Sequence, residues 1–206
     1  MQYIYVMFSK TNTGMGKIIR VLTNRTYNHV SIGLQEKLCP TYSFARRKKY
    51  NVLAGGFIQE SGERLCDGGD IQIKICRVPV SEARYERVQR ILAFCEQHPN
   101  LMIYNSFAAL GSLLRRNLSI PFSFTCVGFV SWCLGEECPC IAPFEKMLSG
   151  CEIYEGSYLA WVGEPSKEEG DYFRPVSLWE LISSNLRHFG DLIGRIICAG
   201  LKRADI

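Results

Sequence analysis

The sequence lacks any apolar run of the roughly 18 to 20 residues that a membrane-spanning helix needs. Its first residues, MQYIYVMFSKTNTGMGK, also lack the basic region, apolar core and cleavage site of a signal peptide. Dense lysine and arginine runs interleaved with aromatic residues are absent, and the net charge of +4 is mild. We therefore expect a cytoplasmic protein with reduced cysteines, no integral membrane segment and no nucleic-acid partner.

No internal repeat and no low-complexity linker divides the 206 residues, and a hydrophobic share of 47% is enough for a sizeable core. We expect one domain over residues 1–206, with residues 136–206 as a C-terminal extension of it. The run TGMGK at 13–17 lacks the spacing of a phosphate-binding loop. We expect no cofactor and no bound metal.

Hydrophobic periodicity and capping residues predict the elements. Alternating or β-branched stretches indicate strands at residues 2–8, 29–34, 57–60 and 71–78, and short strands near 152–154 and 159–162. Apolar stripes behind capping residues indicate helices at residues 16–23, 82–97, 106–116 and 126–134, and a terminal helical region at 177–201 broken at Gly190. Strands followed by helices indicate the α+β class.

One cysteine stands at the start of a predicted helix. Cys126 follows the capping residue Thr125 in SFTCVGFVSWCLG, so it lies in the first turn. The unpaired N–H groups of a first turn favour thiolate over thiol and lower a cysteine pKa. The alternative is that Cys126 is a buried structural residue, since free cysteine is often buried. Cys133, seven residues on in the apolar body of the helix, keeps that structural interpretation.

A nucleophilic thiol needs a base, and the chain has three histidines. His98 at a helix end and His188 in the terminal helix occupy ordinary positions for solvated or capping residues. His29 begins a strand and shares its face with the small Ser31 and Gly33, which leaves room for another element to pack closely. We expect His29 to meet a thiolate on a helix that crosses the sheet.

A third polar group would hold the imidazole in one orientation. Glu60, in GGFIQES, is the leading candidate and Gln59 its rival. Adjacent strand residues point to opposite faces, so only one of the two can reach His29.

Two motifs give the chain a family resemblance. Asn28-His29-Val30-Ser31-Ile32 and Phe124-Thr125-Cys126-Val127-Gly128-Phe129-Val130 resemble the histidine and cysteine motifs of the circularly permuted NlpC/P60 papain-like enzymes, in which the histidine strand precedes the cysteine helix. The resemblance covers about residues 1–135. Val127-Gly128 departs from it, because such enzymes often have a serine or acidic residue soon after the cysteine.

The resemblance implies a permuted papain-like fold, with a small antiparallel sheet packed against helices. It also implies a thiol-dependent hydrolase or acyl transferase acting on an amide or ester, with Cys126 as nucleophile, His29 as base and Glu60 as the third residue. The resemblance implies peptides, peptidoglycan fragments or lipid esters as substrates.

Other interpretations stay open. The same fold could be a non-catalytic domain that binds an anionic ligand beside the cations of residues 46–49, which we otherwise expect in a solvated loop. A zinc-stabilised interaction protein would use the four clustered cysteines, which lack a C-x-x-C pair and a nearby histidine. These are Cys133, Cys138, Cys140 and Cys151. The terminal helix favours docking on the domain, with peripheral membrane contact as the alternative. The oligomeric state is open.

Overall fold

The computed structural model describes residues 1–12, 26–112 and 119–204. The helix expected at 16–23 and the run at 13–17 lie outside these residues, as does the end of the helix expected at 106–116.

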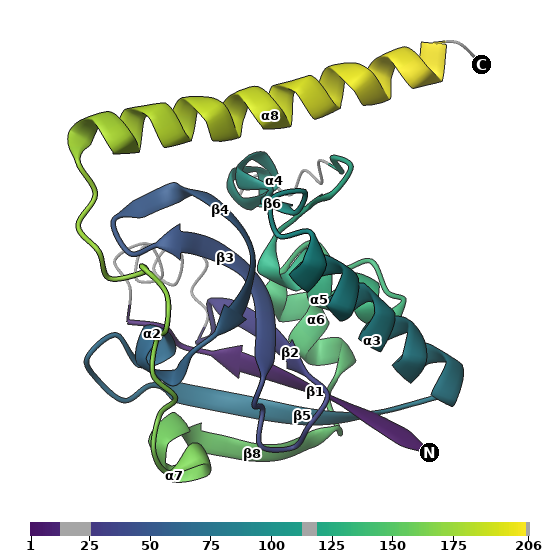
Figure 1. Cartoon of the computed structure of the whole chain (residues 1–206). Coiled ribbons are helices and arrows are strands. Elements are labelled where there is room, and N and C mark those ends of the chain that lie inside the picture. The colour runs from purple at the N-terminus through teal and green to yellow at the C-terminus, as the bar shows by residue number, and fades with distance from the viewer. Residues whose placement is uncertain (13–25, 113–118, 205–206) are drawn as a thin grey trace.

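An eight-stranded sheet organises the described residues (Figure 1), in the order β7-β6-β4-β3-β2-β1-β5-β8. All neighbours are antiparallel except the parallel pair β6-β7. The strands are β1 Gln2–Ser9, β2 His29–Gly33, β3 Thr41–Lys48, β4 Asn51–Glu60, β5 Gln72–Val80, β6 Ile103–Tyr104, β7 Ser123–Phe124 and β8 Glu152–Ser157. The mixed class of strands and helices agrees with α+β. The sheet is mainly antiparallel, as expected, but with eight strands it is larger than the small sheet that we expected.

Helices cover both faces of the sheet. The helices are α2 Gly62–Cys66, α3 Glu82–Gln97, α4 Ser106–Ser112, α5 Cys126–Leu134, α6 Ile141–Met147, α7 Tyr158–Val162 and α8 Leu178–Ala204. On one face α3, α5 and α6 bury the larger core, which includes Val30, Ile32 and the fully buried Phe129. On the other face α2 and α7 pack against Met7 and Ile73. Strand residues two apart serve the same core, as the pleat requires.

The cationic run at 46–49 is not the solvated loop that we expected. It forms the end of β3 and the tight turn into β4, with the side chains of all four residues only partly exposed. Gly55 and Gly56, expected to precede a strand, lie inside β4. A Cβ atom on Gly55 would collide with the Ala45 carbonyl, and one on Gly56 with the Met102 carbonyl. Glycine therefore permits the close approach of neighbouring backbone at both positions.

The region after residue 135 differs most from expectation. Residues 159–162, expected as a strand, lie in α7, because the Ser157 hydroxyl accepts from the Ala160 N–H at 2.9 Å and caps a helix instead. The helix α6 was not foreseen. Only β8 matches an expected strand, and it adds to the edge of the sheet beside β5.

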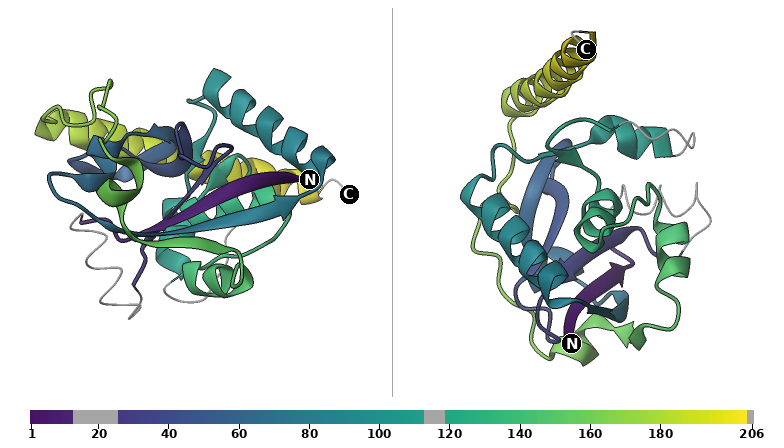
Figure 2. Two further views of the ribbon diagram at one scale, coloured as in Figure 1. Left: turned by 90° about the horizontal axis from the view of Figure 1, so that it is seen from below. Right: turned by 90° about the vertical axis from the view of Figure 1, so that its right-hand side faces the viewer.

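The terminal helix α8 is continuous, so the expected break at Gly190 was wrong; a Cβ there would meet open space. It lies along one end of the molecule, beside β4 and α4 (Figures 1 and 2). Leu192 is fully buried, and His188, expected to be solvated, is buried and 3.1 Å from the Ser106 hydroxyl.

Large apolar side chains remain exposed on the side of α8 next to this buried side. Leu178, Trp179, Ile182, Leu186, Ile193, Ile196 and Ile197 form this exposed stripe. At 100° per residue they fall within about one third of the helix circumference. Among the described residues, no helix is both long and apolar enough to cross a bilayer.

Candidate active site

The start of α5 places Cys126 where the sequence predicted. Thr125 has extended backbone geometry, and its hydroxyl accepts from the Gly128 N–H at 3.1 Å. This cap ends the preceding strand β7 and begins the helix at Cys126. The cysteine is 8% exposed. Its thiol therefore lies in the first helical turn, where the partial positive charge of the helix favours an anion.

His29 reaches Cys126 from the first position of β2. The expectation was that the cysteine helix would pack on the face that carries Ser31. Instead α5 packs on the opposite face, against Val30 and Ile32, because those apolar side chains belong to the larger core. The ring of His29 meets the thiol at the end of the strand rather than across its face, and lies within hydrogen-bonding reach of the sulfur.

Glu60, and not Gln59, is the partner of the histidine. Its Oε1 lies 2.7 Å from His29 Nε2, and its side chain is 2% exposed. Gln59 points out of the sheet and is exposed. Because Nε2 is engaged by the carboxylate, Nδ1 is the nitrogen that remains for the sulfur.

Two further residues fix the carboxylate. The Ser43 hydroxyl, one strand away on β3, donates a hydrogen bond to Glu60 Oε1. Arg64 Nε lies 3.7 Å from the other oxygen, Oε2. Arg64 is presented by α2, which begins directly after Glu60 because the Ser61 hydroxyl caps it, accepting from the Arg64 N–H at 3.1 Å. Both carboxylate oxygens are therefore occupied, so the orientation of Glu60 is fixed.

The electrostatics of the three side chains favour charge separation. Burial raises the pKa of the Cys126 thiol, but the hydrogen bond and charge of His29, with the backbone N–H groups of Val30 and Val127, outweigh it and lower that pKa. Burial lowers the pKa of His29. The hydrogen bonds and charges of Cys126 and Glu60 raise it by more, so the pKa of His29 is higher than its ordinary value. Burial likewise opposes ionisation of Glu60, yet His29 and Arg64 bring its pKa down to about 2. These directions favour a thiolate beside an imidazolium near neutral pH.

The three side chains line a cavity of about 130 Å³. Six other polar side chains line it, and the sequence did not assign any of them to the site: Thr11, Asn28, Arg46, Arg64, Tyr104 and Tyr172. Burial and the nearby Cys126 raise the pKa of Tyr104, so it remains a neutral phenol. The only feature of the sequence that suggested a binding role for any of these side chains was the cationic run at 46–49, which contains Arg46. Tyr172 lies 46 residues beyond Cys126, and no spacing rule connects them.

Tyr172 reaches the cavity on a connecting segment, residues 163–177, that joins α7 to α8. Its carbonyl accepts from the Lys49 N–H at 2.9 Å, and the side chain is 2% exposed. The Gly62 N–H donates to the Ser166 hydroxyl at 2.9 Å, and the Ser61 hydroxyl donates to the Glu168 carboxylate at 2.7 Å. These two hydrogen bonds hold the same segment against the start of α2. The segment thereby closes one side of the cavity.

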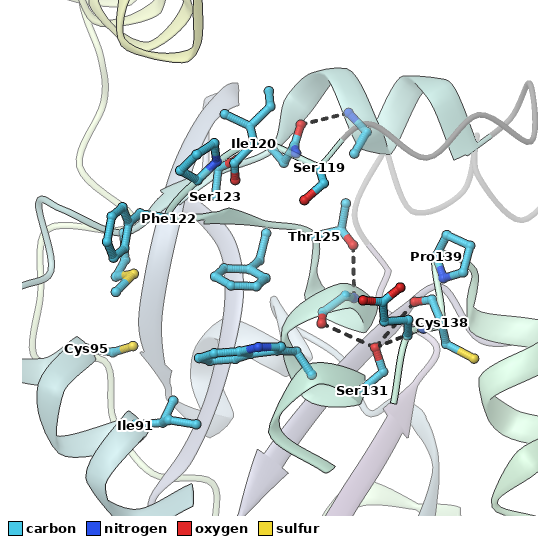
Figure 3. A pocket seen from close by; sticks show the side chains of 18 of the residues that line it. Ile91, Cys95, Ser119, Ile120, Phe122, Ser123, Thr125, Ser131, Cys138 and Pro139 are labelled. Atoms are coloured by element: carbon cyan, nitrogen blue, oxygen red, sulfur yellow. Dashed lines mark hydrogen bonds between the residues drawn. The ribbon is translucent and has the colours of Figure 1, made fainter. Parts of the chain in front are cut away.

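A larger cavity, of about 730 Å³, lies on the other side of α5 (Figure 3). Thr125 and Ser131 face it from the helix, and Ile91 faces it from α3. Successive helical positions differ by about 100°, so Ser131, five residues after Cys126, lies on the side of α5 away from the cysteine. None of the three candidate residues lines this cavity.

The remaining candidates are dispersed. Cys133 is fully buried in the larger core, as expected, and burial raises the pKa of its thiol. Cys138, Cys140 and Cys151 are partly exposed. Within the described part of the chain, no three histidine, cysteine or acidic side chains are arranged to hold a metal ion. His98 is exposed and contacts the Phe94 ring.

Comparison with known proteins gives no relative: no family model matches the chain, and no curated protein or solved structure is significantly similar to it.

Proposed function

We propose that this protein is a thiol-dependent hydrolase or acyl transferase that acts on an amide or ester. The contact between the Cys126 thiol, the His29 ring and the Glu60 carboxylate in one cavity supports the proposal. A nucleophile at a helix start, a base within reach and a third group that orients the base are what thiol catalysis requires.

The reaction begins when Cys126 Sγ bonds to the carbonyl carbon and the carbonyl π electrons move to oxygen. The Cys126 N–H, in the first turn of α5, donates to this oxyanion. When the tetrahedral intermediate collapses, the bond to the leaving amine or alcohol breaks, and the His29 imidazolium supplies its proton. Water or a second acceptor then attacks the thioester while His29 takes its proton, which releases the acyl group and restores the thiolate. Glu60 holds the imidazole throughout.

The fold that we propose is a permuted papain-like fold, in which the histidine strand precedes the cysteine helix. Its support is the order β2, β4 and α5, which supply His29, Glu60 and Cys126 in turn. The proposed substrates are peptides, peptidoglycan fragments or lipid esters. We propose a peripheral membrane contact through the exposed stripe of α8, since tryptophan and aliphatic side chains on one side of a long helix suit the bilayer interface.

Limited alkylation tests the proposed function. With less than one equivalent of iodoacetamide near pH 7, peptide mapping should find Cys126 labelled before the other nine cysteines. Cys39 and Cys198 are the internal controls, because both are exposed and therefore more accessible. Their labelling ahead of Cys126 would contradict the proposal.

Turnover separates an enzyme from a non-catalytic domain of the same fold. Release of p-nitrophenol from p-nitrophenyl acetate should disappear in Cys126→Ala and fall about 100-fold or more in His29→Gln. A matched change, Cys39→Ala, should leave the rate unchanged. Equal rates in the wild type and Cys126→Ala would instead favour the binding domain.

A further inference from the structure

The cavity that holds Cys126 carries more positive than negative charge. Five ionisable side chains other than tyrosine line it: His29, Arg46, Glu60, Arg64 and Cys126. With the thiol ionised and the imidazole protonated, two anions face three cations. One positive charge remains uncompensated among side chains that are buried or partly buried, where charges interact more strongly than in bulk water.

Arg64 does not supply that surplus charge. Its Nε lies 3.7 Å from Glu60 Oε2, and its guanidinium carbon lies 4.2 Å from the centroid of the Tyr172 ring. The side chain is 8% exposed and also donates to the Arg46 carbonyl. Arg64 is therefore committed to Glu60 and to packing.

Arg46 is different, because its contacts fix its position without neutralising it. Nε and Nη2 donate to the Tyr172 hydroxyl at 3.1 and 2.7 Å, and Nη1 donates to the Lys49 carbonyl at 3.0 Å. Both acceptors are uncharged. Among the described residues, no carboxylate lies within ion-pair distance of Arg46, and the guanidinium carries further N–H donors beyond these three.

The three neighbouring cations are either paired with a carboxylate or directed away from the cavity. Lys48 is paired with Glu180 at 2.6 Å, and Lys49 with Asp67 at 2.6 Å. Arg47 points away from the cavity and donates to the backbone carbonyls of Pro99 and Met102. Of the four consecutive cations, Arg46 alone lines the cavity.

We propose that Arg46 forms a subsite for a carboxylate group of the substrate, close to the amide or ester that Cys126 attacks. A planar guanidinium with free N–H donors matches a carboxylate in shape, and its fixed position lowers the ordering cost of binding. The single surplus charge matches a monoanion better than a doubly charged phosphate. The cavity volume of about 130 Å³ suits a small group. This inference rests on the proposed function, and it narrows the substrate to acyl compounds with a carboxylate near the scissile bond.

Two alkylating reagents of similar size test the subsite. Iodoacetate and iodoacetamide each form an S–C bond with a thiolate and release iodide, but only iodoacetate is an anion. The ratio of their rates at Cys126 is independent of the thiolate fraction. In the wild type this ratio should exceed the ratio at the exposed Cys39. Arg46→Gln should lower the ratio at Cys126 by about three- to tenfold, while the iodoacetamide rate changes by less than about twofold.

Two variants serve as controls. Arg46→Lys keeps the charge and should retain most of the preference for iodoacetate. Arg90→Gln removes the same charge from an exposed position on α3 and should leave the ratio unchanged. An unchanged ratio in Arg46→Gln, with its thermal melt intact, would overturn the subsite alone. Failure of both reagents to label Cys126 faster than Cys39 would overturn the proposed function, and the subsite with it.

Discussion

Replacing Glu60 by glutamine should reduce the loss of folding stability that this protein undergoes as the pH falls. The carboxyl pKa of Glu60 is lowered from 4.5 to about 2 in the folded state, despite burial, by His29, Arg64 and Ser43. A depressed carboxyl pKa stabilises the folded state above the ordinary value, and the stabilisation is lost as the pH falls toward the folded value. A difference of about 2.5 in pKa corresponds to about 3 kcal/mol in full, of which about 2 kcal/mol is lost between pH 6 and pH 3.

The measurement is urea unfolding followed by tryptophan fluorescence at several pH values between 6 and 3. Both proteins should carry Cys126→Ala, so that titration of the thiol does not contribute. Glu60 also raises the pKa of the buried His29, so the titration of His29 is followed by NMR in each protein and its contribution is subtracted. After this subtraction, the free energy of unfolding of Cys126→Ala should fall by about 2 kcal/mol more over this range than that of Cys126→Ala/Glu60→Gln. In a third protein, Glu86→Gln on the same background removes an exposed carboxylate of α3 and should keep the full decrease.

The comparison depends on the change with pH and not on the absolute stability of the variant. If the two unfolding free energies, each corrected for His29, run parallel within about 0.5 kcal/mol from pH 6 to pH 3, Glu60 is not held as a carboxylate by His29 and Arg64, and the electrostatic description of the site is wrong.

Two more predictions concern the thiol and the terminal helix. Because the pKa of Cys126 is lowered, its alkylation rate by iodoacetamide should fall less steeply from pH 7.5 to pH 6 than that of N-acetylcysteine, which has an ordinary pKa of about 8.5 and should slow about thirtyfold. Equal slowing of the two thiols would refute the lowered pKa. A double variant of the exposed stripe of α8, Trp179→Ser/Leu186→Ser, should bind membranes less well: the fraction of protein that sediments with vesicles of anionic phospholipid should fall at least by half. The control Ser183→Ala should sediment like the wild type. Unchanged sedimentation of the double variant would exclude the stripe as the membrane contact.

The sequence was most informative where local signals decide the structure. Ser81 and Thr125 cap α3 and α5, and the helices run over the residues that were predicted, 82–97 and 126–134. At three glycines, in contrast, the local signal led to a wrong prediction of where an element begins or breaks. Gly55 and Gly56 lie within β4, where neighbouring backbone approaches too closely for a side chain. Gly190 continues α8 although nothing packs against it, because a single glycine costs a helix only about 1 kcal/mol.

In the candidate site, too, the sequence identified residues by local signals but not residues that depend on tertiary packing. Cys126, His29 and Glu60 were identified from the chemistry of each residue and its place in a predicted element, and the structure brings them into contact. Ser43 and Tyr172 could not be identified in that way. The hydroxyl of Ser43 gains its role only from the register between β3 and β4, which pairs it with Ile58, two residues before Glu60. Tyr172 depends on the path of a connecting segment with no periodic pattern.

The position of Tyr172 has a consequence for the order in which the site is completed during synthesis. The three candidate side chains all leave the ribosome before residue 127, whereas the residue that closes one side of their cavity follows 46 residues after Cys126. At common elongation rates of about 5 to 20 residues per second, that interval is a few seconds. A nascent chain therefore exposes its thiol before the enclosing wall exists, and the cavity is complete only once the segment that carries Tyr172 has docked beside Arg46 and Arg64.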